Sequence, residues 1–349
     1  MKKYQIYEKM PAQINHAVSK APTDVAEIAK DMGFEELYIY KTSNKYDFKS
    51  KLKRQFTYFK DWRSAYKSIE NNSALLLQHP FRTRQLGREK YLKKLKEKKS
   101  VKIISLIHDV EELRQSLFND YYKEEFESML NLADVIIVHN DSMLDFFVKK
   151  GFDKNKLVNL NIFDYLRKDY QPAVPEYSEN ITIAGNLDVK KATYLKDLNT
   201  IQNNFILYGP NYSLHDYKNC KYHGIVPTSE MPNKLKSGWG LIWDGTRVDT
   251  CNGPTGNYLQ YNNPHKLSLY LSSNLPVIIW DKAAEARFVR DNKVGITVSS
   301  LRDISDKFNN IDELKYEEYA ENAKKIGEKL SSGFYTKRAL EKALIDVLN

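Results

Sequence analysis

Short apolar runs alternate with helical patterns along the chain, which predicts an α/β protein. Runs such as Val101–Ile107 and Val135–Val138 are apolar on both faces, as strands of a parallel sheet covered by helices must be. The predicted strands of the first half are Tyr4–Tyr7, Leu37–Tyr40, Ala74–Gln78, Val101–Ile107, Val135–Val138 and Val158–Leu160, with helices at Asp24–Met32, Asp61–Glu70, Gln85–Lys98 and Tyr122–Leu132. This alternation indicates a Rossmann-like domain over residues 1–163.

A polar segment with two prolines, residues 164–180, interrupts the alternation and predicts a linker. A second βαβ series follows over residues 181–330. Its predicted strands are Ile181–Ala184, Phe205–Tyr208, Lys221–Gly224, Gly240–Trp243, Pro276–Trp280 and Gly295–Val298, and its helices are Glu230–Lys236, Pro264–Ser272, Ala283–Asp291, Leu301–Asn309 and Tyr316–Leu330. We therefore expect two Rossmann-like α/β domains facing a cleft, with a terminal helix in residues 331–349 that is able to pack back on the first domain.

Length and composition agree with a soluble cytoplasmic protein of two domains. The chain has 349 residues, of which 42% are hydrophobic and 28% charged, a globular composition. No apolar run approaches the roughly 20 residues needed to cross a bilayer, and no apolar segment of a signal peptide follows the basic N-terminus. Two cysteines without metal-ligand or redox spacing suit a reducing compartment. The sequence is compatible with a homo-oligomer.

The formal net charge of +9 raises the question of an anionic partner. The densest basic run is Arg88–Lys102, which is either a solvated helix face or a patch that holds the protein peripherally at the inner face of an anionic membrane. Nucleic acid is not expected, because no helix-turn-helix signal, RNP-type motif or zinc module accompanies the charge.

Several enzyme signatures are absent from the sequence. It contains no P-loop, no dinucleotide fingerprint, no G-x-S-x-G and no H-E-x-x-H. It also lacks the D-x-D pair with which many sugar-nucleotide enzymes hold a divalent metal. If the protein handles a nucleotide diphosphate, Lys, Arg and backbone N–H groups must neutralise it in place of a metal.

The polar cluster 262–266 supplies groups of that kind at the start of a predicted helix. Pro264 is suited to a first helical turn, and Lys266 adds a full charge to the partial positive charge of the helix N-terminus. Small residues at Ala283 and Ala284, after the next strand, let a ligand approach the backbone. A capped helix with no ligand is the plain alternative. The polar cluster, with Asn263 and Lys266, favours a phosphate and sugar site.

The segment 262–301 resembles the donor-binding half of bacterial two-domain (GT-B) glycosyltransferases. More narrowly, it is similar to galactofuranosyltransferases and to the related transferase that extends sugars on serine-rich-repeat adhesins. Ile107–Asp109, Ala184–Asn186 and Gly238–Asp244 carry the same resemblance in the same order along the chain. It implies an enzyme that moves a hexosyl group from a UDP-sugar to a glycan, glycolipid or glycoprotein acceptor, with no resident cofactor.

The resemblance also implies which residues bind the nucleotide-sugar. Gly185 and Asn186 match a turn where the backbone approaches the donor, and either Lys190 or Lys191 matches a basic residue that contacts the diphosphate. Lys266 matches the basic residue of the phosphate-facing helix. The backbone amides of Ala283 and Ala284 match a loop that touches the donor sugar. Glu285 follows this loop, but the family's E-x7-E pattern is not reproduced around it.

His108 and Asp109 end a first-domain strand and are the catalytic candidates. They would orient or deprotonate an acceptor hydroxyl. The alternative is that Asp109 caps the next helix and that His108 packs beneath it.

Two further loops provide candidate donor contacts. Ser19 and Lys20 join the first strand to the first helix, where a capped helix start is the alternative. The segment 244–261 is long, polar and glycine-containing, and we interpret it as a donor-sugar lid with Asp244 and Tyr258 as its main contacts.

The expected reaction is metal-independent hexosyl transfer from a UDP-sugar. Lys266, one of Lys190 and Lys191, and helix N-terminal amides would stabilise the charge that develops on the leaving diphosphate. Galactofuranose, glucose and N-acetylglucosamine all fit as the donor sugar. The alternative is a non-catalytic nucleotide-sugar-binding accessory subunit of another transferase. An epimerase is disfavoured because the dinucleotide fingerprint is missing.

Overall fold

The first domain contains a six-stranded sheet in which every neighbouring pair of strands is parallel. The computed structural model describes residues 1–9, 20–45, 47–115, 117–171, 173–215 and 217–348. The strand order is β2-β1-β3-β4-β5-β6. The strands are β1 (Lys3–Lys9), β2 (Glu35–Tyr40), β3 (Ala74–His79), β4 (Lys102–Ile107), β5 (Val135–Val138) and β6 (Leu157–Asn159). All six were expected from the apolar runs.

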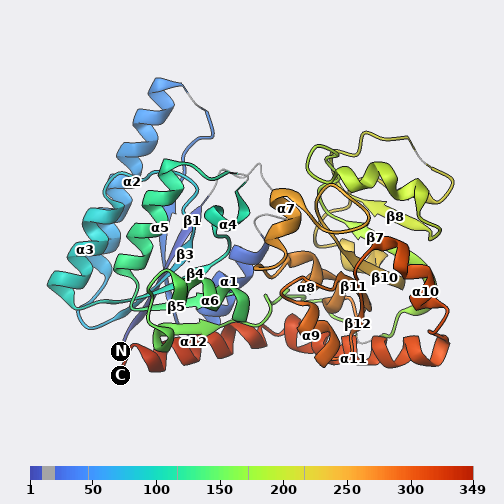
Figure 1. Ribbon diagram of the computed structural model, residues 1–349. Helices are drawn as coiled ribbons and strands as arrows, with labels where there is room; N and C mark the ends of the chain where they lie inside the picture. Colours follow the sequence, from blue (N-terminus) through green and yellow to red (C-terminus); the bar gives the residue numbers. More distant parts are fainter. Residues whose placement is uncertain (10–19, 46, 116, 172, 216, 349) are drawn as a thin grey trace.

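A second six-stranded parallel sheet, in the order β12-β11-β10-β7-β8-β9, forms the other domain (Figure 1). The two sheets confirm the predicted α/β class. The strands are β7 (Glu176–Ala184), β8 (Phe205–Tyr208), β9 (Cys220–Tyr222), β10 (Ser237–Ile242), β11 (Val277–Trp280) and β12 (Gly295–Val298). Strand β7 begins inside the segment that the prolines marked as a linker, because its first residues pair with β10 despite their polar side chains.

Helices cover both sheets. Those of the first domain are α1 (Lys20–Asp31), α2 (Phe48–Ser68), α3 (Arg88–Lys99), α4 (Glu111–Arg114), α5 (Asp120–Leu132) and α6 (Asp141–Lys149). The α2 helix begins about three and a half turns before the predicted start at Asp61. Its N-cap is Asp47, whose carboxylate accepts a hydrogen bond from Ser50 N at 3.0 Å.

The helices after β10 are α7 (Gly253–Tyr258), α8 (His265–Ser272), α9 (Ala286–Asp291), α10 (Ile304–Phe308), α11 (Glu313–Ser331) and α12 (Phe334–Asp346). The helix expected at Glu230–Lys236 is only a 3-10 turn, Met231–Lys234. Helix α12 crosses back and packs against α1, β5 and β6, so that the two chain ends lie close together (Figure 1). Asp164 anchors it by accepting the backbone N–H groups of Tyr335 and Thr336.

The strand order places a crevice at the carboxyl ends of β7 and β10. The chain leaves β7 toward β8 on one side and later returns to β10 on the other, so the two connections diverge there. Ligands of open α/β sheets bind at such a switch point. In the first sheet the switch lies between β1 and β3. The fold thus predicts a ligand site formed by Ala184–Asn186, Trp243–Asp244 and the helix that follows them.

Candidate functional site

The loop after β7 depends on close backbone packing. A side chain at Gly209 would bring its Cβ within 1.7 Å of Gly185 O, so only glycine fits at that position. Asn186 is exposed, and its Oδ1 accepts hydrogen bonds from Asp188 N at 3.1 Å and Asn211 Nδ2 at 2.9 Å. Gly185 and Asn186 therefore form a tight, solvent-facing turn at the β7 end of the switch point.

Tyr270 fixes helix α8 against the same switch point. Its ring fills the space above Gly240, where an added Cβ would lie 2.2 Å from the ring. Its hydroxyl accepts a hydrogen bond from Ala184 N at 2.8 Å and donates to Thr182 O at 3.1 Å. Helix α8 is thereby tied to the last residues of β7.

Lys266 lies in the first turn of α8, whose N-cap is Pro264. Its Nζ donates to Trp243 O at 3.3 Å and lies 3.9 Å from Asp244 Oδ2. The Lys266 side chain is 23% exposed, so an anion from solvent reaches it. Lys266 and Asp244 are thus brought together at the end of β10, and an anionic ligand would compete with Asp244 for the ammonium group.

The other predicted phosphate and sugar contacts differ in how they are placed. Lys190 and Lys191 are exposed in the loop after β7. The backbone N–H groups of Ala283 and Ala284 already donate to Trp280 O at 3.1 Å and to Leu259 O at 2.8 Å. Glu285, next along the loop, is buried, which raises the pKa of its carboxyl well above the usual range. Burial thus disfavours the charged form of the Glu285 carboxyl beside the predicted diphosphate site.

The segment 244–261 is packed against the protein. Val248 and Cys251 are buried, and Trp243 Nε1 donates to Arg247 O at 2.9 Å. Tyr258, at the end of α7, crosses to the first domain: its hydroxyl accepts from Val110 N at 3.0 Å and lies 3.4 Å from Asp109 Oδ1. Tyr258 thus joins the donor-side segment to the residue predicted to act on the acceptor.

Asn263 also joins the two domains. Its Nδ2 donates to His139 O at 2.7 Å and to Asn161 O at 3.0 Å, and its Oδ1 accepts from Asn140 Nδ2 at 2.7 Å. Its backbone N–H donates to His139 Nδ1 at 2.9 Å. The amide of Asn263 therefore holds the loop before α8 against the ends of β5 and β6, in an arrangement that the sequence did not indicate.

His108 is held at the carboxyl end of β4. Its Nε2 lies 2.6 Å from Gln78 Oε1, and its ring stacks on Phe163 with centroids 5.3 Å apart. Burial is the main cause that lowers the pKa of His108 well below its usual value, and the nearby His139 adds to this effect. The imidazole is consequently neutral at pH 7, with the proton of Nε2 donated to Gln78.

Asp109 is paired with two arginines rather than capping a helix. Its Oδ2 lies 2.5 Å from Arg82 Nη2 and 3.0 Å from Arg114 Nη1, and Arg82 also pairs with Glu111. The N-cap of α4 is Val110, which has no side-chain cap, so the capping alternative for Asp109 is wrong. The side chain remains 20% exposed at the domain interface.

Lys20 lies at the junction of α1 and the linker. Its Nζ is 2.7 Å from Asp24 Oδ2, donates to Leu166 O at 2.9 Å and lies 4.7 Å from the centre of the Tyr165 ring. These contacts tie Lys20 to the linker. Ser19 lies outside the described residues.

The buried His139 connects the two domains through a hydrogen bond that depends on its protonation. His139 Nε2 donates to Ile107 O at 3.0 Å, while Nδ1 accepts from Asn263 N. Burial lowers the pKa of His139 to about 4, against a weaker opposite effect of Asp109. Burial also lowers the pKa of His265, at the start of α8, to about 4. A proton on His139 Nδ1 would remove the acceptor of Asn263 N–H.

We therefore expect His139 to make the protein acid-sensitive. Its pKa is lower in the folded than in the unfolded chain, so the unfolded state binds more protons and the stability from neutral His139 is lost as the pH falls from about 6.5 to about 4. The loss is on the order of 3 kcal/mol. Asp164 acts oppositely, since burial raises its pKa to about 7. The measurement is therefore the difference in melting temperature between the native chain and His139→Gln across this range.

The native chain should be the more stable at neutral pH, and its advantage over His139→Gln should shrink on acidification. The exposed His215 provides the control: His215→Gln should keep a constant difference from the native chain. A constant difference for His139→Gln would contradict the assignment of His139 as the acid-sensitive contact.

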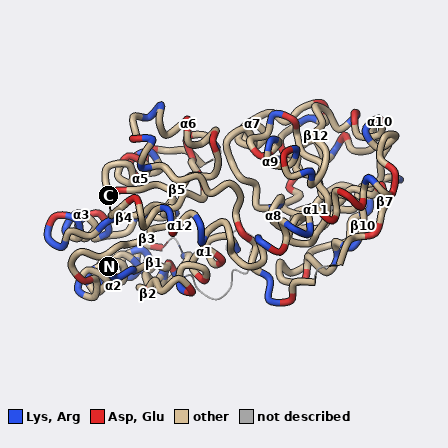
Figure 2. The backbone as a smooth tube through the Cα atoms, turned by 90° about the horizontal axis from the view of Figure 1, so that it is seen from below, with Lys and Arg blue, Asp and Glu red and all other residues tan. Residues whose placement is uncertain are grey.

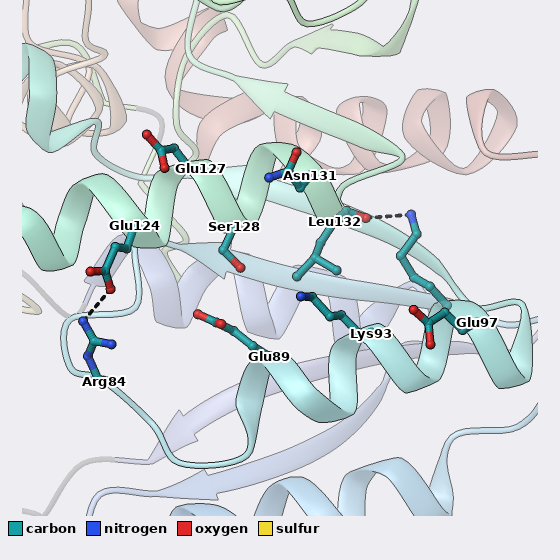
Figure 3. A pocket seen from close by; sticks show the side chains of 10 residues that line it. Arg84, Glu89, Lys93, Glu97, Glu124, Glu127, Ser128, Asn131 and Leu132 are labelled. Carbon is teal, nitrogen blue, oxygen red and sulfur yellow. Dashed lines mark hydrogen bonds and ion pairs between the residues drawn. The ribbon is translucent and has the colours of Figure 1, made fainter.

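A groove of about 660 Å³ lies away from these residues, between α3 and α5 (Figure 3). It is lined by side chains of both charges, and two of them already pair with groups across it: Arg84 with Glu124 at 2.5 Å and Lys96 with Leu132 O at 2.7 Å. In the part of the chain that is described, no group of three His, Cys, Asp or Glu side chains is arranged to hold a metal ion. The same residues include no helix long and apolar enough to cross a membrane.

Solved structures share the fold of the protein. Sucrose-phosphate synthase from Thermosynechococcus elongatus superposes over 99% of both chains with a TM-score of 0.62 at 10% identity. Anabaena Alr3699/HepE in complex with UDP and glucose superposes over 98% of this chain and 99% of its own with a TM-score of 0.59 at 11% identity. The two six-stranded parallel sheets and their arrangement match the GT-B fold.

Sequence comparison identifies the family. Residues 3–162 match the glucosyltransferase 3-like N-terminal domain, and residues 181–343 match the corresponding C-terminal domain. The β-1,6-galactofuranosyltransferase WbbI of Escherichia coli K12 is 37% identical over 70% of this chain and 72% of its own. Glucosyltransferase 3 of Streptococcus gordonii is 27% identical over 94% of each chain. The chain belongs to the glucosyltransferase 3-like family of glycosyltransferases, as the resemblance of its motifs indicated.

Proposed function

We propose that this enzyme transfers a hexosyl group from a UDP-sugar to an acceptor hydroxyl without a bound metal ion. The observation that carries the proposal is the position of Lys266, in the first turn of α8 and beside the β7–β10 switch point. The relatives named above are a galactofuranosyltransferase and a glucosyltransferase, and HepE binds UDP and glucose. These names support a uridine diphosphate donor for this chain.

The leaving diphosphate is assigned to the second domain. The first N–H groups of α8 have no partner within the helix, and Lys266 adds a positive charge beside them. Lys190 or Lys191 approaches from the loop after β7, next to the open turn Gly185–Asn186. As the glycosidic bond to the diphosphate breaks, negative charge grows on its oxygen, and these groups stabilise it.

The acceptor is assigned to the first domain. Neutral His108, aligned by Gln78, and Asp109, held between two arginines, lie at the carboxyl end of β4 and face the donor domain through Tyr258. An acceptor hydroxyl placed there donates its hydrogen bond to Asp109 or His108 while its oxygen forms the new bond to the anomeric carbon.

The donor sugar is galactofuranose or glucose, with N-acetylglucosamine as a third candidate, and the acceptor is a glycan, glycolipid or glycoprotein of the cell surface. Ala283, Ala284 and Asp244 are the residues assigned to the sugar itself. For the two alanines this assignment requires contacts other than their N–H groups, which are already bonded within the protein.

The proposal is tested by the melting temperature of the protein with and without UDP, in the presence of EDTA. A ligand that binds only the folded state raises the melting temperature. At a ligand concentration of a hundred times the dissociation constant, the free energy of unfolding increases by about 2.7 kcal/mol. We expect a shift in EDTA that manganese does not enlarge. A shift that appears only with manganese would contradict metal-independent binding. The absence of a shift under both conditions would contradict UDP as the nucleotide part of the donor.

A further inference from the structure

The first half of α2 projects beyond the rest of the first domain (Figure 1) and carries an uncovered apolar stripe. The stripe consists of Phe48, Leu52 and Phe56, which are 79%, 62% and 70% exposed. Their spacing of four residues places them on one face of the helix. Single exposed apolar side chains are ordinary, but three in succession on one projecting helix face indicate an interaction surface.

Other apolar side chains extend the stripe in both directions. Phe59, one turn further along α2, is partly covered by Tyr91 of α3, with ring centroids 5.8 Å apart. Leu86 is 55% exposed and lies beside the helix, because its N–H donates to Gln55 Oε1 at 2.8 Å. The stripe is thus the uncovered continuation of a face that α3 covers further along.

Basic residues flank the stripe without any acidic residue among them. Between Phe48 and Lys60 the chain contains no Asp or Glu. Four lysines of this segment are exposed, and we call them the lysine cluster: Lys49, Lys51, Lys53 and Lys60. Lys and Arg positions are concentrated along α2 and α3 (Figure 2). An apolar stripe beside a basic face is the pattern of a helix that lies in a membrane interface.

The neighbouring helix α3, part of the basic run Arg88–Lys102, is less suited to that role. Its apolar side chains Tyr91, Leu92 and Leu95 are buried. Two of its lysines are engaged: Lys96 pairs with Asp134 at 2.9 Å, and Lys99 donates to the backbone. The helix therefore offers charge but no apolar surface.

We propose that the stripe and the lysine cluster dock this enzyme on a membrane surface that contains anionic lipid. The apolar side chains enter the boundary between headgroups and acyl chains, and the lysines pair with anionic headgroups. A second copy of the chain is a less suitable partner, because a two-fold interface places the same patch against itself and would set the lysine cluster against its own copy. This role is separate from sugar transfer, and its test needs neither donor nor acceptor.

The test is flotation of the full chain with vesicles of phosphatidylcholine alone or mixed with phosphatidylglycerol. The native protein is expected to float with the mixed vesicles and to stay behind with phosphatidylcholine alone. A stripe variant, in which all three stripe residues are serine, and a charge variant, Lys49→Glu with Lys51→Glu and Lys53→Glu, should each bind the mixed vesicles at least about tenfold more weakly.

Two matched controls separate this surface from general apolar or basic character. Leu314→Ser removes a side chain that is 76% exposed on α11 of the other domain, and Lys93→Glu with Lys94→Glu reverses exposed charges on α3. Both should float like the native chain, and all variants should keep the native melting temperature. The proposal is overturned if the native chain does not float with anionic vesicles, or if the α3 variant loses binding and the α2 variants do not. A concentration-dependent oligomer that the stripe variant abolishes, without vesicle binding, would assign the stripe to a second copy instead.

Discussion

Replacing Lys266 with alanine is expected to slow sugar transfer by about 10²–10³-fold, the effect of removing one preorganised group that stabilises developing negative charge. The ammonium group belongs to the first turn of α8, and among the described residues the carboxylate that it pairs with is Asp244, at 3.9 Å. Because the diphosphate carries charge before and during the reaction, UDP binding should weaken as well. Steady-state kinetics and the melting-temperature shift with UDP measure the two effects separately.

Lys234→Ala, at an exposed lysine in the 3-10 turn of the same domain, is the matched control and should retain native kinetics. Lys266→Arg should recover part of the UDP shift, because it restores the charge at a different length and shape. If Lys266→Ala keeps both the native rate and the native UDP shift, the α8 N-terminus is not the diphosphate site.

Replacing Asp109 with asparagine is expected to lower the transfer rate by about 10²-fold while UDP binding stays unchanged. Asparagine keeps the size of the side chain but removes the charge that Arg82 and Arg114 both contact. The amide also offers a donor where the acceptor hydroxyl needs an acceptor. Because Asp109 belongs to the first domain, the loss should appear in kcat with acceptor and not in the melting-temperature shift with UDP.

Glu112→Gln is the control for charge near α4, since Glu112 pairs with Lys150 at 2.6 Å and is more exposed than Asp109. It should transfer sugar at the native rate. A native transfer rate in Asp109→Asn would remove Asp109 from the reaction. An equal loss of UDP binding and transfer would instead assign Asp109 a structural role through Tyr258.

The fold was predictable because a covered parallel sheet needs strands that are apolar on both faces. Val135–Val138 and Phe205–Tyr208 were predicted with the same limits that the structure has. Burial within the covered sheet sets the residue types of these strands, so the apolar run and the strand coincide. Helix α7 was missed, because Gly253 and Pro254 open it and its short length gives no periodicity. The first half of α2 was missed for a different reason: its apolar stripe is exposed, so the pattern of a packed helix is absent there.

The candidate site was predictable only where a local feature marked it. Lys266 follows a proline at a helix start, and Asp109 follows an apolar strand, so both could be named from the sequence. Tyr270 could not, because its importance depends on the space left by Gly240 and on a hydrogen bond to Ala184, some 86 residues away along the chain. The same holds for His139, whose contact with Asn263 joins two domains.

The most direct test of the central claim is UDP release from UDP-galactofuranose, UDP-glucose and UDP-N-acetylglucosamine, measured in EDTA for the native chain and for Lys266→Ala. The account predicts that the native chain releases UDP from at least one of these donors, that manganese does not increase the rate, and that Lys266→Ala loses most of the activity. Release that requires manganese would contradict metal-independent transfer. No release from any donor, with or without manganese, while UDP still binds, would contradict transfer itself and indicate a nucleotide-sugar-binding accessory subunit.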